Sequence, residues 1–192
     1  MSAHTDINIE IKRSFGVLYI AVALAILFAA PLSLLLSLKQ VPYFYYPALW
    51  LGSFLLFLGV GIYKRRKVFH SVRTRMKKSL SWPSYIKAIN GLCWAGPFLA
   101  IPLFHQLSPY LILLGIGLGN LSTYYFIQKY SNVNNREQLI VGLIALCSIP
   151  ITILLDNTIF SIYEIEILFS RLLIAASYGS GGVYALIAKD QT

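Results

Sequence analysis

The chain has 192 residues, of which 57% are hydrophobic and 12% are charged. Ordinary soluble domains carry about 25% charged residues, so the composition excludes a typical soluble domain and predicts that lipid surrounds most of this chain. Sixteen Lys and Arg residues against seven Asp and Glu residues give a formal net charge of +9. What that charge implies depends on where the basic residues lie along the chain.

The N-terminal segment precedes the first apolar run. It lacks the early basic region of a cleavable signal peptide, and the run that follows exceeds the usual length of a signal-peptide core. We therefore expect a retained first span. The stretch DINIEIK, residues 6–12, alternates polar and apolar side chains, and we expect it to form an interfacial or disordered leader.

Six apolar runs reach or approach the roughly 20 residues that a helix needs to cross a hydrocarbon core of about 30 Å. They extend over Phe15–Leu38, Tyr45–Tyr63, Tyr85–Phe104, Pro109–Ile127, Leu139–Leu155 and Ile167–Ala188. Helices are expected because lipid offers no hydrogen bonds to the backbone. The sequence thus predicts an all-α, polytopic membrane protein with six transmembrane helices in a single domain, residues 1–192.

Proline and glycine alternate between these runs. The first, third and fifth runs contain Pro31, Pro97 and Pro150, whereas the second, fourth and sixth concentrate glycine. A proline frees a backbone carbonyl and bends a helix, so one interpretation is three helical hairpins, each a bent helix followed by a close-packing one. The alternative is that both residues are simply frequent in membrane helices.

Basic residues lie at alternate connections. Lys12 and Arg13 precede the first run, a basic segment fills the second connection, Lys129 and Arg136 lie in the fourth, and Lys189 follows the sixth. The remaining connections contain a single basic residue. Because basic residues favour the cytoplasmic side of short loops, the sequence predicts that both termini are cytoplasmic.

Residues 64–84 form the one substantial polar segment and are predicted to be a basic amphipathic cytoplasmic loop. Its basic residues are Lys64, Arg65, Arg66, Lys67, Arg73, Arg75, Lys77 and Lys78. Each basic residue near an anionic inner leaflet contributes about 1 kcal/mol of attraction, so anionic lipid is the predicted partner and nucleic acid is not needed to explain the net charge. A purely topogenic signal and a cytoplasmic partner protein are the alternatives.

Arg171 lies about one turn inside the sixth run. An arginine at the centre of a membrane costs about 2.5–3.5 kcal/mol on insertion scales and is usually paired or faces a cavity. Asp156, Glu164 and Glu166, expected in the preceding loop, are the predicted ion-pair partners. The alternatives to an ion pair are an arginine that reaches the headgroups and an anion or substrate site open to the outside.

Small residues predict close helix packing in two runs. They are Gly115 and Gly119 in the fourth, and Ala175, Gly179 and Gly182 in the sixth. Such residues let helix backbones approach each other. Asn120 and Asn90 add polar groups in the fourth and third runs. They are predicted to form interhelical hydrogen bonds or, alternatively, to line a path for a small solute together with Arg171.

The sequence YGSGGVYAL, Tyr178–Leu186, resembles the serine motif of rhomboid intramembrane proteases. The resemblance implies that Ser180 is a nucleophile. Such a serine needs a histidine as base, but no histidine follows Ser180, and His105 is predicted to lie at the outer end of the third run. A structural role for this glycine-rich stretch is therefore the favoured interpretation.

Other chemistry has no signature in the sequence. The histidines and the two cysteines, Cys93 and Cys147, lack metal-ligand spacing, and no glycine-rich phosphate loop is present. We therefore expect neither a metal nor a cofactor.

Three function classes remain. The first is a non-catalytic subunit or organiser of a membrane protein complex, associating with other membrane subunits or with itself. The second is a small oligomeric transporter or channel for a small solute such as an anion. The third, least favoured, is an intramembrane serine protease-like enzyme, so the expectation is a protein that is not an enzyme.

Overall fold

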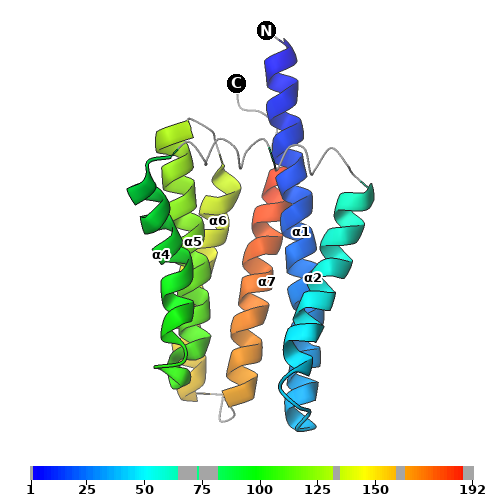
Figure 1. The fold of residues 1–192 in the computed structure, drawn as a ribbon, viewed down its shortest axis with the longest axis vertical. Coiled ribbons are helices and arrows are strands. Elements are labelled where there is room, and N and C mark those ends of the chain that lie inside the picture. The colour runs from blue at the N-terminus through cyan, green and yellow to red at the C-terminus, as the bar shows by residue number, and fades with distance from the viewer. Residues whose placement is uncertain (1, 65–72, 74–81, 132–134, 159–162, 188–192) are drawn as a thin grey trace.

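The computed structural model describes the backbone of residues 2–64, 73, 82–131, 135–158 and 163–187, and the side chains of these residues apart from 2–11, 61–64, 157 and 158. In these residues the chain is almost entirely helical and contains no strand (Figure 1). This agrees with the predicted all-α fold. The basic residues of the predicted loop, other than Lys64 and Arg73, lie outside the described residues.

Three long helices come from the N-terminal half of the chain. Helix α1 covers Ser2–Leu38, α2 covers Tyr45–Lys64 and α4 covers Ser84–Ala100. Helix α1 begins well before the first apolar run, so the expected leader is helical and not disordered. Helix α4 ends at Ala100, earlier than the predicted span, which extends to Phe104. Pro102 has no backbone N–H to continue the helical hydrogen bonds, although Ile101 before it keeps helical dihedral angles (φ −56°, ψ −45°).

The C-terminal half supplies three more long helices. A short 3-10 helix, η1 (His105–Leu107), leads into α5 (Ser108–Ser131), which is followed by α6 (Arg136–Thr158) and α7 (Tyr163–Ile187). Asp156, Glu164 and Glu166, expected in a loop, therefore lie within helices. Glu164 and Glu166 occupy the first turn of α7, where carboxylates favour helix formation by interacting with the positive end of the helix dipole.

In the described residues, α1 and α7 make the most extensive contact between helices, and chain-adjacent helices also pack in pairs. Helix α1 packs on α2, α4 on α5 and α6 on α7, and further contacts of α7 with α1 and of α5 with α6 and α7 join the pairs. Helices α2 and α4 form opposite edges of the bundle, and α1 begins at the same end at which α7 ends (Figure 1).

The main core lies where α1, α5, α6 and α7 meet. Tyr19 and Tyr178 make an edge-to-face contact with ring centroids 5.4 Å apart, and Leu113 and Val141 are fully buried beside them. A smaller cluster centred on Trp82 joins the start of α4 to the end of α5. The edge helices contribute little to the main core.

Glycine allows close approach of helix backbones in this core. A methyl group added at Gly182 of α7 would lie 3.0 Å from the carbonyl oxygen of Gly16 in α1, and one added at Gly142 of α6 would lie 3.0 Å from that of Gly117 in α5. Any larger residue at these points would push the helices apart.

Within the described ranges, three helical segments are long and apolar enough to cross a membrane: Lys12–Leu38, His105–Ser131 and Arg136–Asp156. Tyr45–Val60 is a shorter apolar helix. These segments indicate a membrane location. Helix α4 has 17 residues, equivalent to about 25 Å at 1.5 Å per residue, which is less than the hydrocarbon thickness.

Candidate functional site

Arg171 of α7 is held by side chains of α1 and α2. Its Nη1 donates a hydrogen bond of 2.6 Å to Oγ of Ser33 on α1. Its guanidinium carbon lies 5.1 Å from the ring centroid of Trp50 on α2. A cation–π contact of this kind contributes about 0.5–2 kcal/mol. Helices α1 and α2 therefore position the charged group.

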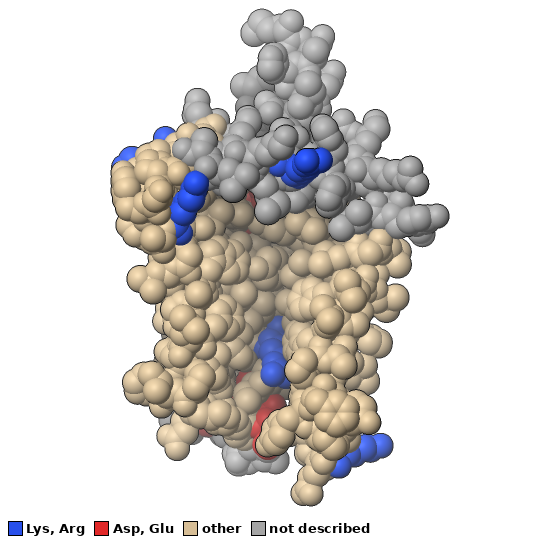
Figure 2. Space-filling view, in the orientation of Figure 1, with Lys and Arg blue, Asp and Glu red and all other residues tan. Residues whose placement is uncertain are grey.

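A cavity of about 110 Å³ adjoins Arg171. Among the side chains that line it are Ser33, Ser37, Tyr46 and Glu164. Among the described residues, no carboxylate forms an ion pair with Arg171. Figure 2 shows a basic side chain in the groove between the two halves of the bundle, with acidic side chains below it. The cavity thus contains both signs of charge without a direct contact between them.

The other two predicted ion-pair partners lie at a different interface. Tyr110 of α5 donates a hydrogen bond of 2.9 Å to Oδ2 of Asp156 on α6. Glu166 is 5% exposed, and its Oε1 has no hydrogen-bond partner in the described part of the chain. Of the three predicted carboxylates, Glu164 is the one that lines the Arg171 cavity.

Asn90 joins α4 to α5. Its Oδ1 accepts hydrogen bonds from Ser122 at 2.8 Å and from Thr123 at 3.0 Å. The Thr123 hydroxyl in turn accepts a hydrogen bond of 3.0 Å from Nε1 of Trp94. The side-chain carbonyl oxygen of Asn90 therefore takes part in hydrogen bonds that join α4 to α5.

Asn120 joins α5 to α7. It is 1% exposed, and its Nδ2 donates to the carbonyl of Ile116 at 2.9 Å and to the hydroxyl of Tyr178 at 3.4 Å. The three predicted lining residues therefore lie at three separate helix interfaces. The structure does not bring Asn90, Asn120 and Arg171 together.

The predicted small residues lie at two helix interfaces. A methyl group at Gly115 would meet the ring of Phe98, and one at Gly119 would lie 2.3 Å from the ring of Trp94. These two glycines of α5 therefore receive aromatic side chains of α4. Their close neighbours are side chains and not the backbone of another helix.

On α7, Ala175, Gly179 and Gly182 face α1. Ala175 is 2% exposed, and a methyl group at Gly179 would lie 3.9 Å from Cβ of Ala23. Gly182 is the tightest of the three, against Ile20 and the backbone of Gly16.

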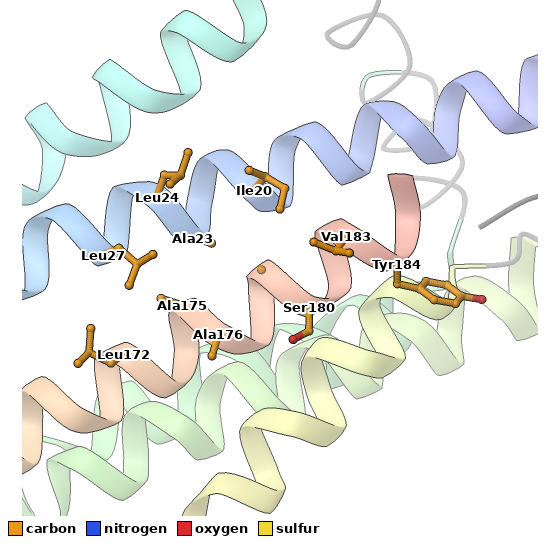
Figure 3. Close-up of a pocket in the computed structure, with 11 residues that line it drawn as sticks. Ile20, Ala23, Leu24, Leu27, Leu172, Ala175, Ala176, Ser180, Val183 and Tyr184 are labelled. Atoms are coloured by element: carbon orange, nitrogen blue, oxygen red, sulfur yellow. The ribbon is translucent and has the colours of Figure 1, made fainter. Parts of the chain in front are cut away.

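A long apolar groove follows the seam between α1 and α7 (Figure 3). It encloses about 760 Å³. Leu24 and Leu27 of α1 and Leu172 of α7 are among the residues that form its sides, and Ala176 and Gly179 leave space along α7. Sequence reasoning did not predict this groove, because it arises from the pairing of two helices that are far apart in the chain.

Ser180 is exposed in this groove. His105, in η1, receives a hydrogen bond of 2.6 Å at its carbonyl from Tyr163, which begins α7. Tyr163 and Ser180 are 17 residues apart on one helix, which corresponds to about 25 Å along its axis. His105, which contacts Tyr163, is therefore far from Ser180. Within the described residues, no cluster of three or more metal-ligating side chains occurs.

The predicted lipid-binding residues are mostly not described. Arg73 is exposed, and Lys64 is the last residue of α2. The other six, Arg65, Arg66, Lys67, Arg75, Lys77 and Lys78, lie outside the described residues.

Several partners of the site residues were not predicted from the sequence. Ser33 and Ser37 lie four residues apart on one face of α1, a spacing that could have marked a polar stripe. Trp50 and Gly16 carry no comparable signal, because their importance depends on which helix lies beside them. No family model, curated protein or solved structure matches this chain.

Proposed function

We propose that the chain is a six-span integral membrane protein with both termini in the cytoplasm, acting as a non-catalytic subunit or organiser of a membrane protein complex. The observation that carries this proposal is the separation of the interior polar groups. Asn90, Asn120 and Arg171 are each engaged at a different helix interface, as expected if they join helices and do not line one solute path.

The two edge helices support an assembly role. Leu51 and Leu55 of α2 are 63% and 65% exposed, and Leu92 and Leu99 of α4 are 68% and 72% exposed. Methyl groups added at Gly52 and Gly59 of α2 would meet nothing within 4 Å. Lipid or another subunit would cover these faces, and exposed glycine is suited to close approach by a second helix.

The distribution of charge supports the proposed orientation. In Figure 2 the described Lys and Arg side chains lie mainly towards the end where α1 begins, and the acidic side chains lie mainly towards the opposite end. In this orientation the 64–84 loop faces an anionic inner leaflet, which is its proposed lipid partner.

The experiment is extraction of the C-terminally tagged chain in a mild detergent, followed by quantitative mass spectrometry of co-purifying proteins. Gly59→Leu and Gly91→Leu place the same bulk on the open faces of α2 and α4, respectively. A stoichiometric partner, or a second copy, that is retained by one variant and lost by the other would support the proposal. The variant that loses it would show whether α2 or α4 forms the contact. A chain that purifies alone in every form would contradict it.

Transport of a small anionic solute is the second candidate, and the cavity beside Arg171 is the observation that favours it. A chain of this class would move the solute across liposomes. Arg171→Ala should then abolish flux while the protein stays folded, whereas Arg136→Ala, at an exposed position, should not change it. Absence of flux in the wild-type protein would reject this candidate.

Hydrolysis at Ser180 is the least supported candidate. The serine lies in an apolar groove lined by α1 and α7, about 25 Å along the helix from the residue that contacts His105. We therefore propose that the protein is not an enzyme. A Ser180→Ala variant should behave as wild type in the purification above.

A further inference from the structure

Three polar side chains from three helices meet near the end of the bundle where α6 ends and α7 begins (Figure 1). Tyr110 of α5 donates a hydrogen bond of 2.9 Å to Oδ2 of Asp156 on α6. The Tyr110 hydroxyl and the Asp156 carboxyl both lie within hydrogen-bonding reach of Glu166, in the first turn of α7. One tyrosine and two carboxyl groups therefore join these helix ends.

This group of side chains has too few hydrogen-bond donors. A tyrosine hydroxyl carries a single proton, and an ionised carboxylate carries none. The proton of Tyr110 is directed to Asp156, so it does not serve Glu166 at the same time. In the described part of the chain, Oε1 of Glu166 is buried and has no hydrogen-bond donor. One additional proton, placed between the two carboxyl groups, would supply the missing donor.

Burial makes a second negative charge unfavourable at this point. Glu166 is 5% exposed, and a buried carboxylate is costly unless an opposite charge accompanies it. In the described residues, the groups that act on Glu166 are Tyr110 and Asp156, with no basic side chain among them. Burial above all, and the Asp156 carboxyl beside it, raise the pKa of Glu166 against an opposing effect of the Tyr110 hydrogen bond.

One negative charge, by contrast, is well placed here. Asp156 is half-buried and already has a donor in Tyr110. The first turn of α7 also presents the positive end of the helix dipole, which favours a nearby anion. Two ionised carboxyl groups would repel each other at this distance, and two neutral ones would forgo the interaction with the helix end. One proton for two carboxyl groups satisfies both conditions.

The other titratable and charged groups of this region are engaged elsewhere. Glu164 lies two residues before Glu166, on the other side of α7, where it lines the cavity beside Arg171. His105 of η1 is exposed, and its Nδ1 lies 3.3 Å from the hydroxyl of Tyr163. Histidine side chains commonly titrate near neutral pH, so His105 requires a control of its own.

We propose that Asp156 and Glu166 share one proton, which Glu166 donates to Asp156, and that this proton joins the end of α6 to the start of α7. The pair is thus a proton-binding site at an interface of three helices. While the proton is bound, the helix ends are held together. When it passes to water, two adjacent negative charges repel each other and loosen the contact. The proposal depends on neither the subunit role nor the orientation in the membrane.

The first test is infrared spectroscopy of the purified full chain in detergent micelles at neutral pH. A protonated carboxyl has a carbonyl stretch distinct from the bands of a carboxylate, and ordinary carboxyl groups are ionised at this pH. We expect the wild type to show a protonated-carboxyl band. Glu166→Gln and Asp156→Asn should each remove the intensity of one group, since the introduced amide supplies a donor to the remaining carboxylate. Glu164→Gln, the matched control, should keep the full intensity.

Two infrared results would overturn the proposal. One is the absence of a protonated-carboxyl band in the wild type. The other is unchanged intensity in either Glu166→Gln or Asp156→Asn, because a shared proton requires both carboxyl groups. Each substitution exchanges an oxygen for an amide nitrogen and leaves the size of the side chain unchanged. Either variant therefore tests the proposal if the other does not fold, and circular dichroism checks the fold of both.

The second test is thermal unfolding in the same micelles, from about pH 4, near the ordinary pKa of a carboxyl group, to about pH 9. A carboxyl that binds its proton more tightly in the folded chain stabilises the fold at low pH, and this stability is lost as the pH rises through the raised pKa. We expect the melting temperature of the wild type to fall by about 2–4 °C as the pair loses its proton. Glu166→Gln should remove this fall, whereas His105→Gln should leave it in place. An equal fall in Glu166→Gln and the wild type would contradict the proposal.

A metal ion is the other occupant that two carboxyl groups could hold, because oxygen ligands suit Ca²⁺ and Mg²⁺. Either ion, added at neutral pH, would then raise the melting temperature of the wild type but not that of Glu166→Gln, and would abolish the protonated-carboxyl band. We expect neither ion to have these effects. If one does, the pair is a cation site and the shared proton is rejected.

Discussion

Polar side chains inside the bundle form hydrogen bonds that cross between helices. The Trp94–Thr123–Asn90 network is the clearest case, because each donor that joins α4 to α5 has a side-chain acceptor on the other helix. Thr152, by contrast, is fully buried but donates only to Ser148, one turn earlier in its own helix. A comparison of substitutions at these two threonines therefore distinguishes the contribution of a hydrogen bond between helices from that of a hydrogen bond within one helix.

Thr123→Val keeps the shape of the side chain but removes the hydroxyl. We expect it to lower the free energy of unfolding by about 1 kcal/mol, because the Trp94 indole N–H loses its acceptor. Equilibrium unfolding in mixed micelles, followed by circular dichroism, measures the change. Thr152→Val, the matched control, should cost less. Equal costs for the two variants would show that the network between α4 and α5 contributes nothing specific.

From the sequence it was easier to select the polar residues that need a partner inside the bundle than to predict the partners themselves. Arg171, Asn90 and Asn120 could be singled out because a polar group in lipid requires a partner. Their partners, Ser33, Ser122 with Thr123, and Tyr178, depend on which helices become neighbours. That choice is made by tertiary packing and has no signal at the residue itself.

At the scale of the element, helix ends are determined by local backbone chemistry. Helix α1 ends in a Schellman arrangement, in which the N–H of Val41 bonds to the carbonyl of Leu36 and the N–H of Gln40 to that of Ser37. Gln40 has a φ of 52°, a left-handed conformation that costs non-glycine residues about 1–2 kcal/mol.

Gln40→Gly should therefore stabilise the protein. We expect the free energy of unfolding to rise by about 0.5–1 kcal/mol, because glycine adopts a positive φ without strain. The same micelle unfolding assay measures it. Lys39→Gly, one residue earlier and not at positive φ, should instead be neutral or destabilising. Destabilisation by Gln40→Gly would contradict this account of the helix end.

Close packing between α4 and α5 depends on glycine. Gly119→Leu would place a side chain into the ring of Trp94, which already lies 2.3 Å from a methyl group built at this position. Overpacking of this kind typically costs about 1–3 kcal/mol. Gly91→Leu introduces the same residue where no atom lies within 4 Å. A loss of stability in the Gly119 variant alone, by micelle unfolding, is the expected result, and equal effects would contradict it.

Helix boundaries show what apolar runs can and cannot predict. An apolar run marks the part of a helix that matches lipid, but a helix continues as long as its backbone geometry permits. Helix α7 thus begins at Tyr163, four residues before the predicted span, with Glu164 and Glu166 in its first turn. Helix α4 stops at Ala100, where Pro102 offers no backbone N–H to extend the helical hydrogen bonds, although the apolar run continues to Phe104.

At the scale of the whole molecule, the pairing of α1 with α7 is the feature that the sequence did not predict. Each of these helices contributes small residues, Gly16 and Ala23 from one and Ala175, Gly179 and Gly182 from the other. The set on α7 could be recognised as a packing surface from its spacing, yet nothing in a single sequence states that it meets Gly16 and Ala23. The groove and the Arg171 cavity exist only because of this pairing.

The described helices contain fewer long apolar segments than the six proposed spans. Helices α1, α5 and α6 contain the segments long enough to cross a membrane, and α2, α4 and α7 lie beside them along the bundle (Figure 1). If only the three long segments crossed, the connection between α2 and α4 and the C-terminus would lie outside. With six spans both lie in the cytoplasm.

Cysteine labelling distinguishes these topologies. In a Cys93→Ser, Cys147→Ser background, we expect Arg73→Cys to react with a membrane-impermeant maleimide only after the cells are permeabilised, because a six-span chain keeps this basic connection inside. Lys39→Cys should be labelled on intact cells and Lys129→Cys only after permeabilisation under either topology, so they serve as controls. Labelling of Arg73→Cys on intact cells, with both controls as expected, would reject six spans and show that α2 does not cross the membrane.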